Sequence, residues 1–219
     1  MKRKSFCIGL GLLLLFIIWT VALRFVDVQA IGPKGSSVGF ASLNKTAHNI
    51  TGVHMSLYTI TDWLGLVPIL VIMGFGILGL CEWTRRKNLF KVDYSLLTLG
   101  GFYIVVMVAY IFFEMFVVNY RPILINEVLE ASYPSSTTML VMCVMPTAIR
   151  QFNARIKSNE FKKCVKILIS AFIAFMVIGR LISGVHWLSD IIGGALLSSS
   201  LVLIYNSIQL SGGENNAQK

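Results

Sequence analysis

Charged residues are scarce in this 219-residue sequence. Only 13% of the residues are Asp, Glu, Lys or Arg, whereas 56% are hydrophobic, and the mean hydropathy is +0.75. Soluble domains carry about 25% charged residues, so the composition excludes an ordinary soluble domain. Several apolar runs approach the ~20 residues that a helix needs to cross a bilayer. The sequence therefore predicts an all-α, polytopic membrane protein.

Cysteine and histidine are also few, and their spacing argues against metal and disulfide sites. The four cysteines lie within or beside apolar runs and form no Cys-x-x-Cys pair, so neither a disulfide framework nor a zinc site is predicted. His48 and His54 are six residues apart, a spacing that suits a metal pair on a helix poorly. We expect these two histidines to be solvated loop residues, and we expect no metal ion and no cofactor.

Six apolar runs predict a six-transmembrane-helix bundle. The first run follows Lys2-Arg3-Lys4 and resembles a signal peptide with a cleavage site near Val28-Gln29-Ala30, but it is long for one, so we expect a retained helix. Thr61-Asp62 is expected to cap the second helix. The predicted spans are residues 6–23, 63–82, 94–118, 136–150, 165–182 and 190–208.

The chain is expected to form three parts. Residues 1–60 would hold the first helix and an extracytoplasmic loop, residues 61–210 the transmembrane core, and residues 211–219 a disordered cytoplasmic tail. These bounds follow the change from mixed to strongly apolar composition and back.

The basic residues are distributed unevenly between the two sides of these spans. If the spans alternate in direction, 14 of the 19 lysines and arginines fall on one side and five on the other. Cytoplasmic loops carry an excess of Lys and Arg, so we expect a multi-pass protein of the cell membrane with both termini in the cytoplasm. This topology accounts for the net charge of +9, and no nucleic-acid partner is predicted.

Polar residues from three segments fall together on the less basic side. Ionisable groups at a membrane boundary are costly and are usually functional, so we expect them to converge in one extracytoplasmic site. The residues concerned are Arg121, Ser135, Ser136, Arg180, His186 and Asp190.

Their residue types suit a phosphate group. The guanidinium groups of Arg121 and Arg180 match phosphate oxygens, and a helix that opens at Ser135 presents amide N–H groups to an anion. His186 and Asp190 are four residues apart and share a face if the last helix has already begun. A carboxylate that holds one imidazole nitrogen leaves the other free to attack. For each residue alone a helix cap or a snorkelling arginine is the simpler interpretation; their combination favours a site.

The spacing resembles the motifs of the type 2 phosphatidic acid phosphatase superfamily of membrane phosphatases. That family carries K-x6-R-P, P-S-G-H and S-R-x5-H-x3-D in this order, and the resemblance covers roughly residues 60–208. It implies that His186 is a nucleophile that forms a phosphohistidine, that Asp190 orients its ring, and that the other residues hold phosphate. The matching residues are Arg121-Pro122, Pro134-Ser135, and Arg180, His186 and Asp190.

Four motif positions depart from the family. Glu114 stands in place of the first-motif lysine, Ser136 and Thr137 replace the glycine and histidine of the second motif, and Gly179 replaces the serine before the third-motif arginine. In the family the replaced histidine donates a proton to the leaving oxygen. A threonine hydroxyl cannot do so readily near neutral pH.

Two functions are compatible with these departures. An enzyme would favour lipid diphosphates such as undecaprenyl diphosphate over phosphatidic acid, because a phosphate monoester, with a second pKa near ~6, leaves more readily than an alkoxide. Glu130, Tyr133 or a loop histidine is then a candidate acid. A pseudoenzyme would bind phospholipid or isoprenoid phosphate head groups without turnover.

The role of Glu114 and the class of the protein also leave alternatives open. This acid either pairs with Arg121 or Arg180 or lies deeper as a polar core group. A transporter is less favoured, because the polar residues gather at one face rather than at mid-membrane. The expected partners are a lipid phosphate substrate and membrane lipids; the oligomeric state is not predicted.

Overall fold

The computed structural model describes residues 2–217, with side chains throughout that range except for Lys2, Phe90 and residues 211–217. Helices make up nearly all of its regular structure. Within the described residues, the only β-type pairings are three isolated bridges in loops. The prediction of an all-α protein is confirmed.

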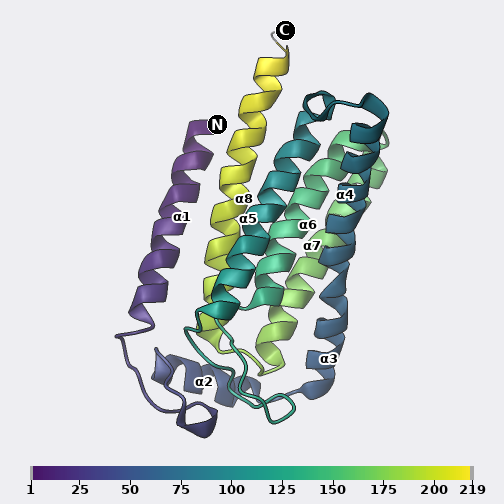
Figure 1. Ribbon diagram of the computed structural model, residues 1–219. Coiled ribbons are helices and arrows are strands. Elements are labelled where there is room, and N and C mark those ends of the chain that lie inside the picture. The colour runs from purple at the N-terminus through teal and green to yellow at the C-terminus, as the bar shows by residue number, and fades with distance from the viewer. Residues whose placement is uncertain (1, 218–219) are drawn as a thin grey trace.

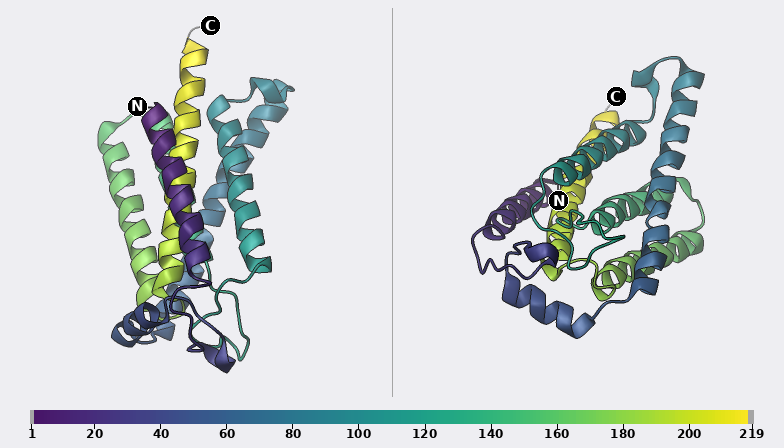
Figure 2. Two further views of the ribbon diagram at one scale, coloured as in Figure 1. Left: turned by 90° about the vertical axis from the view of Figure 1, so that its left-hand side faces the viewer. Right: turned by 60° about the horizontal axis from the view of Figure 1, so that its bottom comes forward.

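Six long helices lie side by side and form the body of the molecule (Figure 1). Two short helices lie at one end, and both chain ends lie at the other (Figures 1 and 2). The long helices are α1 (Lys2–Ala22), α4 (Leu66–Arg86), α5 (Tyr94–Met115), α6 (Ser136–Arg155), α7 (Asn159–Ile182) and α8 (Leu188–Ala217); the short ones are α2 (Ala41–Thr51) and α3 (Met55–Leu64).

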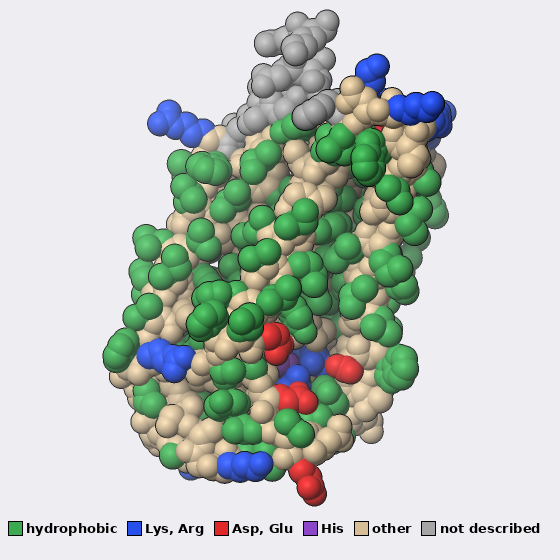
Figure 3. All heavy atoms as spheres, in the orientation of Figure 1, with side chains coloured by type: hydrophobic (Ala, Val, Ile, Leu, Met, Phe, Trp, Pro, Cys, Tyr) green, Lys and Arg blue, Asp and Glu red, His purple; other side chains and the backbone are tan. Residues whose placement is uncertain are grey.

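The outer helices carry the apolar surface that a bilayer requires. Five helical segments in the described chain are long and apolar enough to cross a membrane: α1, α3 with α4, α5, α7 and α8. Figure 3 shows hydrophobic side chains over the middle of the body and charged ones towards its ends. The polytopic transmembrane bundle predicted from the sequence is confirmed.

The helix α6 is less apolar because protein, rather than lipid, surrounds much of it. It packs against α4, α5, α7 and α8. Two of its buried polar side chains have partners inside the bundle: Thr147 Oγ1 lies 3.1 Å from the Tyr103 hydroxyl, and Gln151 Nε2 donates to the Ser95 carbonyl at 3.1 Å. Burial of polar groups with such partners costs little free energy. The helix α6 is therefore the sixth helix of the bundle.

The first helix is tied to the last one along its length. A Cβ on Gly9 would lie 3.2 Å from the Ser200 carbonyl oxygen, so glycine permits a close approach here, and Ser200 Oγ donates to the Gly9 carbonyl at 2.9 Å. At the other end of α1, the indole N–H of Trp19 donates to the Ser189 carbonyl at 3.2 Å. The start of α8, which carries Asp190, is therefore held from the side of α1.

Two predicted boundaries differ from the structure. Thr61-Asp62 does not cap a helix but lies inside α3, where Thr61 Oγ1 donates to the Leu57 carbonyl at 2.8 Å. The apolar stretch before it already forms a helix that leads into α4. At the other end, residues 211–217, expected to be disordered, continue α8 to Ala217; residues 218–219 lie outside the described chain.

The two loop histidines also differ from each other. His54 is exposed, as expected, and its Nε2 lies 2.9 Å from the Thr51 carbonyl oxygen. His48 is half-buried on α2, with its ring 5.5 Å from the Trp187 ring, and burial lowers its pKa. The prediction of a fully solvated His48 is wrong because α2 folds back over the segment that leads into α8.

Candidate active site

The turn between α7 and α8 fixes the position of His186. The helix α7 ends at Ile182, and Gly184 follows with φ of +69°, a conformation that side chains disfavour. A Cβ on Gly184 would lie 2.0 Å from the Gly52 carbonyl oxygen, and the His54 amide donates to the Ser183 carbonyl at 3.0 Å. The loop between α2 and α3 is therefore locked against this turn.

A serine that no motif indicated connects the histidine to the aspartate. The His186 Nδ1 atom lies 3.9 Å from Asp190 Oδ2 but 3.0 Å from Ser132 Oγ. The Ser132 hydroxyl donates to Asp190 Oδ2 at 2.5 Å. Because a hydroxyl has one proton, its oxygen then accepts from Nδ1–H, and the lone pair of the neutral ring lies on Nε2. The predicted contact of histidine with aspartate is present as a bridge through Ser132.

The aspartate is fully buried and held by several donors. Trp187 N donates to Asp190 Oδ2 at 2.9 Å, and Asn119 Nδ2 donates to Oδ1 at 3.3 Å. Neither donor was predicted from the sequence. These bonds fix the carboxylate where it can orient Ser132 and, through it, the imidazole.

The α7 arginine lies directly against the imidazole. Arg180 is 1% exposed, and its Nη2 lies 3.5 Å from His186 Nε2. Its Nη1 lies 3.5 Å from Asp62 Oδ1, and the guanidinium lies 5.1 Å from the centre of the Tyr58 ring. The Nε of Arg180 is buried without a hydrogen-bond partner in the described chain.

The second predicted arginine approaches the same tyrosine. Arg121 lies 5.9 Å from the Tyr58 ring centre, and its Nε lies 3.0 Å from Glu130 Oε2. Its Nη1 is buried and has no hydrogen-bond partner among the described residues. Buried guanidinium donors without partners are costly, so the two arginines offer N–H groups to an anion that would satisfy them.

The environment keeps His186 neutral. Burial, followed by the positive charges of Arg121 and Arg180, holds the pKa of His186 well below its ordinary value of 6.5. The structure therefore brings both predicted arginines close enough to act on the imidazole. A neutral imidazole is the form that can attack an electrophile.

The two predicted serines have different surroundings. Ser135 is fully buried and caps α6: its Oγ accepts from the Thr138 amide at 3.5 Å, and its own amide donates to the Asp190 carbonyl at 3.1 Å. That amide is thus not free for an anion. Ser136 instead lines a small pocket of about 10 Å³ together with His186.

The departures from the family motifs also face different directions. Glu114 is exposed on α5 and lines the same pocket as His186. It forms no ion pair within the described chain, because the arginines pair with Asp62 and Glu130 instead. Thr137 points towards the junction of α3 and α4, where a Cβ on Gly65 would lie 3.6 Å from its methyl group.

The other candidate acids, Tyr133 and Glu130, are engaged in other contacts. The Tyr133 hydroxyl lies 2.6 Å from Thr20 Oγ1 on α1, and burial raises its pKa, so it serves the packing of α1. Glu130 is committed to Arg121. Residues 1–60 also support the site: Asn44 Oδ1 accepts from the Ser189 amide at 3.0 Å.

Comparisons with known proteins agree with this arrangement. The model of the PAP2 superfamily matches residues 71–211. The crystal structure of a transmembrane PAP2 type phosphatidylglycerolphosphate phosphatase from Bacillus subtilis is similar, with 19% sequence identity, 93% of this chain and 96% of that chain covered, and a TM-score of 0.63. At this identity the likeness concerns the fold. No curated protein sequence matches the chain.

Proposed function

The chain belongs to the PAP2 superfamily, and from this membership and the geometry above we propose that it is an extracytoplasmic lipid phosphatase that acts through a phosphohistidine on His186. The observation that carries the proposal is the position of the His186 Nε2 atom. It is unprotonated, lies 3.5 Å from the Arg180 guanidinium and belongs to a ring that stays neutral. No metal ion enters the proposal.

The reaction has two displacements. The Nε2 lone pair attacks phosphorus, an Nε2–P bond forms, and the bond between phosphorus and the leaving oxygen breaks. Water then attacks the same phosphorus, the Nε2–P bond breaks, and inorganic phosphate is released. In the intermediate the ring is an imidazolium, and Nδ1–H remains bonded to Ser132, whose hydroxyl is held by Asp190.

The arginines would hold the transferred phosphoryl group. Its charge spreads over the equatorial oxygens, and Arg121 and Arg180 each carry a buried N–H group without a partner in the described chain. Ser136, at the start of α6, adds a polar wall to the pocket. Ser135 contributes by capping α6 and holding the Asp190 backbone.

The leaving group determines which lipid is the better substrate. Thr137 cannot act as the general acid that the family's histidine provides. Glu114 is the carboxyl that shares a pocket with His186. We therefore assign proton donation to Glu114 in its protonated form. Because a threonine hydroxyl at the position of the family's histidine does not donate a proton readily, the enzyme would favour lipid diphosphates, such as undecaprenyl diphosphate, whose leaving group needs little protonation.

Access would be lateral from the bilayer. The pocket beside His186 is lined by Tyr110, Phe113 and Glu114 of α5 and by Met139 of α6. Met115 and Phe116, next to Glu114, are exposed, as expected for an entrance that faces lipid. A head group can enter here while its tail stays in the membrane.

A binding protein without turnover is the second candidate. It is favoured by one observation: the position of the family's acid is Thr137, which faces Gly65. Such a protein would retain lipid phosphates on the two arginines and release no phosphate.

The decisive experiment uses purified protein and lipid diphosphate labelled in its terminal phosphate. We expect acid-labile protein labelling and phosphate release in the wild type. Both should be absent in His186→Ala and retained in His54→Ala, which removes an exposed histidine and serves as the control. Undecaprenyl diphosphate should be hydrolysed faster than phosphatidic acid or phosphatidylglycerol phosphate. Binding without labelling would establish the pseudoenzyme instead, and faster hydrolysis of either monoester would contradict the leaving-group argument.

A further inference from the structure

A basic pocket lies at the end of the bundle opposite to the His186 pocket. It is formed where α4 ends, α5 begins and α6 ends, and its volume is about 330 Å³. Three arginines contribute to it, one of them from α6, far from the other two in the sequence. The lining residues are Leu78, Cys81, Glu82, Arg85, Arg86, Leu96 and Arg155.

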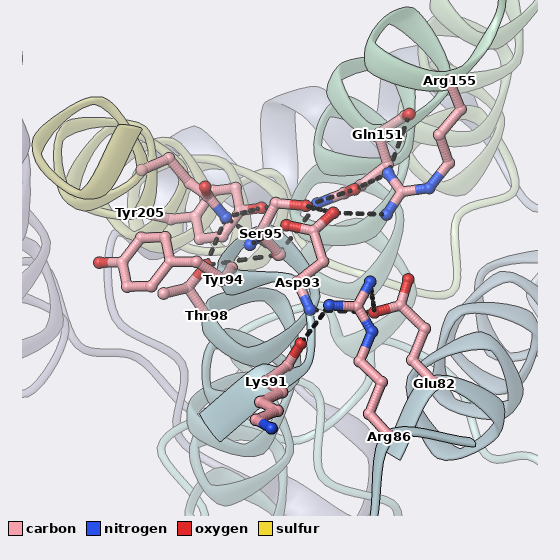
Figure 4. A network of polar contacts seen from close by, with 11 residues as sticks. Glu82, Arg86, Lys91, Asp93, Tyr94, Ser95, Thr98, Gln151, Arg155 and Tyr205 are labelled. Atoms are coloured by element: carbon pink, nitrogen blue, oxygen red, sulfur yellow. Dashed lines mark hydrogen bonds and ion pairs between the residues drawn. The ribbon is translucent and has the colours of Figure 1, made fainter. Parts of the chain in front are cut away.

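A polar network holds two of these arginines in place (Figure 4). Arg86 Nη1 donates to the Lys91 carbonyl at 2.5 Å, and its Nη2 lies 3.9 Å from Glu82 Oε2. Arg155 Nη2 lies 3.4 Å from Asp93 Oδ2. The connection between α4 and α5 is thereby fixed to α6, and the two arginines are preorganised at the pocket.

The third arginine leaves the cluster with excess positive charge. Arg85 is exposed and makes no ion pair within the described chain. Three guanidinium groups thus face only two carboxylates, those of Glu82 and Asp93. The pocket is suited to a phosphate group with one negative charge.

An apolar groove runs from this pocket between α4 and α5. Its volume is about 560 Å³, and Leu96 lines both the groove and the basic pocket, so the two adjoin. A Cβ added to any of four glycines along the groove would have no atom within 4 Å: Gly76, Gly79, Gly100 and Gly101. The small residues leave open space between two helices that face lipid.

We propose that this groove and pocket bind one anionic phospholipid of the leaflet that surrounds the basic end of the bundle. Its phosphate would lie among Arg85, Arg86 and Arg155, and an acyl chain would fill the groove. The charge of the pocket complements the phosphate, and basic pockets between transmembrane helices recognise anionic head groups. The proposal is independent of catalysis at His186.

A lipid suits this site because the basic pocket, which would hold the phosphate, adjoins the apolar groove, which would hold an acyl chain. A free phosphate would not use the groove, and a helix of a second copy would leave the arginines unneutralised. A zwitterionic lipid would bring a positive group to a site that is already positive.

The test measures lipid binding to delipidated full-length protein by native mass spectrometry. The probes are phosphatidylglycerol and phosphatidylcholine with identical acyl chains. Arg85→Gln should weaken the first phosphatidylglycerol binding event about tenfold, as expected for one lost charged hydrogen bond. Lys87→Gln, which removes a neighbouring charge outside the pocket, should change it little. Both variants leave Arg121 and Arg180 intact, so lipid bound near His186 does not affect the comparison.

The groove is tested with matched glycine variants. Gly100→Leu places a side chain in the groove, whereas Gly74→Leu places one in open space outside it. Only Gly100→Leu should reduce phosphatidylglycerol binding. The proposal would be overturned if Arg85→Gln and Lys87→Gln had equal effects, or if Gly100→Leu left phosphatidylglycerol binding unchanged. It would also be overturned if phosphatidylcholine were retained equally well, or if the protein formed a dimer that Gly100→Leu dissociates.

Discussion

In the proposed reaction, a single hydroxyl proton decides which nitrogen of His186 attacks phosphorus. Ser132 donates it to Asp190, which leaves the serine oxygen to accept Nδ1–H. The loop that carries Ser132 has no sequence periodicity, so its bridging position could not be predicted. Asp190 alone, at 3.9 Å from Nδ1, is too distant for a hydrogen bond.

The first prediction concerns this bridge. Ser132→Ala should lower kcat about 10- to 100-fold, because one hydrogen bond to a charged group is lost, while KM changes little. Ser132→Thr keeps the hydroxyl and should retain most of the activity. Steady-state kinetics on a lipid diphosphate measure both. If the alanine and threonine variants are equally impaired, Ser132 matters for packing rather than for the proton.

The second prediction concerns pH. The nucleophile must be neutral, and burial together with Arg121 and Arg180 lowers the pKa of His186, so the wild-type rate should persist well below pH 6.5. Removing one positive charge makes protonation easier and raises this pKa. The acid limb of the profile of kcat/KM against pH should therefore move to higher pH in Arg121→Gln.

The control for this shift is Arg24→Gln. Arg24 donates to the Val117 carbonyl at 2.8 Å and lies on the same side of the bundle, but it does not act on the His186 pKa. Its acid limb should coincide with that of the wild type. An unmoved limb in Arg121→Gln would show that the imidazole is not the titrating group.

At the scale of elements, the long helices were predictable and their mutual placement was not. Spans have to be apolar over about 20 residues, so the hydropathy pattern located α1, α4, α5, α7 and α8. The start of α3 was missed because Thr61-Asp62 has the composition of a cap. The Tyr58 ring, which both arginines approach, depends on where α3 lies and has no signal of its own in the sequence.

The third prediction concerns the turn between α7 and α8. Gly184→Ala should destabilise the protein strongly, because it adds a positive-φ penalty of about 1–2 kcal/mol to a Cβ that would lie 2.0 Å from the Gly52 carbonyl oxygen. Gly35→Ala is the matched control: φ is +73° there, but the added Cβ has no atom within 4 Å. Thermal unfolding in detergent measures both.

The expected order is a small loss for Gly35→Ala and a larger one for Gly184→Ala, with loss of activity in the latter alone. Such a result would show that the close approach of the loop between α2 and α3, and not backbone strain, positions His186. Equal losses would assign the whole effect to the backbone conformation.

At the scale of the whole molecule, the distribution of basic residues predicts how the protein is oriented in the membrane. The fold separates two polar ends: α2 and α3 lie at the end with His186, whereas the turns after α4 and α6 lie at the end with both termini (Figures 1 and 2). Of the 19 basic residues, 14 belong to the second end by the predicted topology. Because cytoplasmic loops carry an excess of Lys and Arg, we propose that this end lies in the cytoplasm.

The fourth prediction tests this orientation in intact cells. In a background without the four native cysteines, Lys45→Cys on α2 should react with a membrane-impermeant maleimide, and Lys163→Cys on α7 should react only after permeabilisation; both side chains are exposed. Hydrolytic activity of the cysteine-free background is the control for its fold. The reverse labelling pattern would place His186 at the cytoplasmic face, where lipid diphosphates would have to be cleaved on the inner leaflet, and the extracytoplasmic assignment would be lost while the chemistry of the site remained.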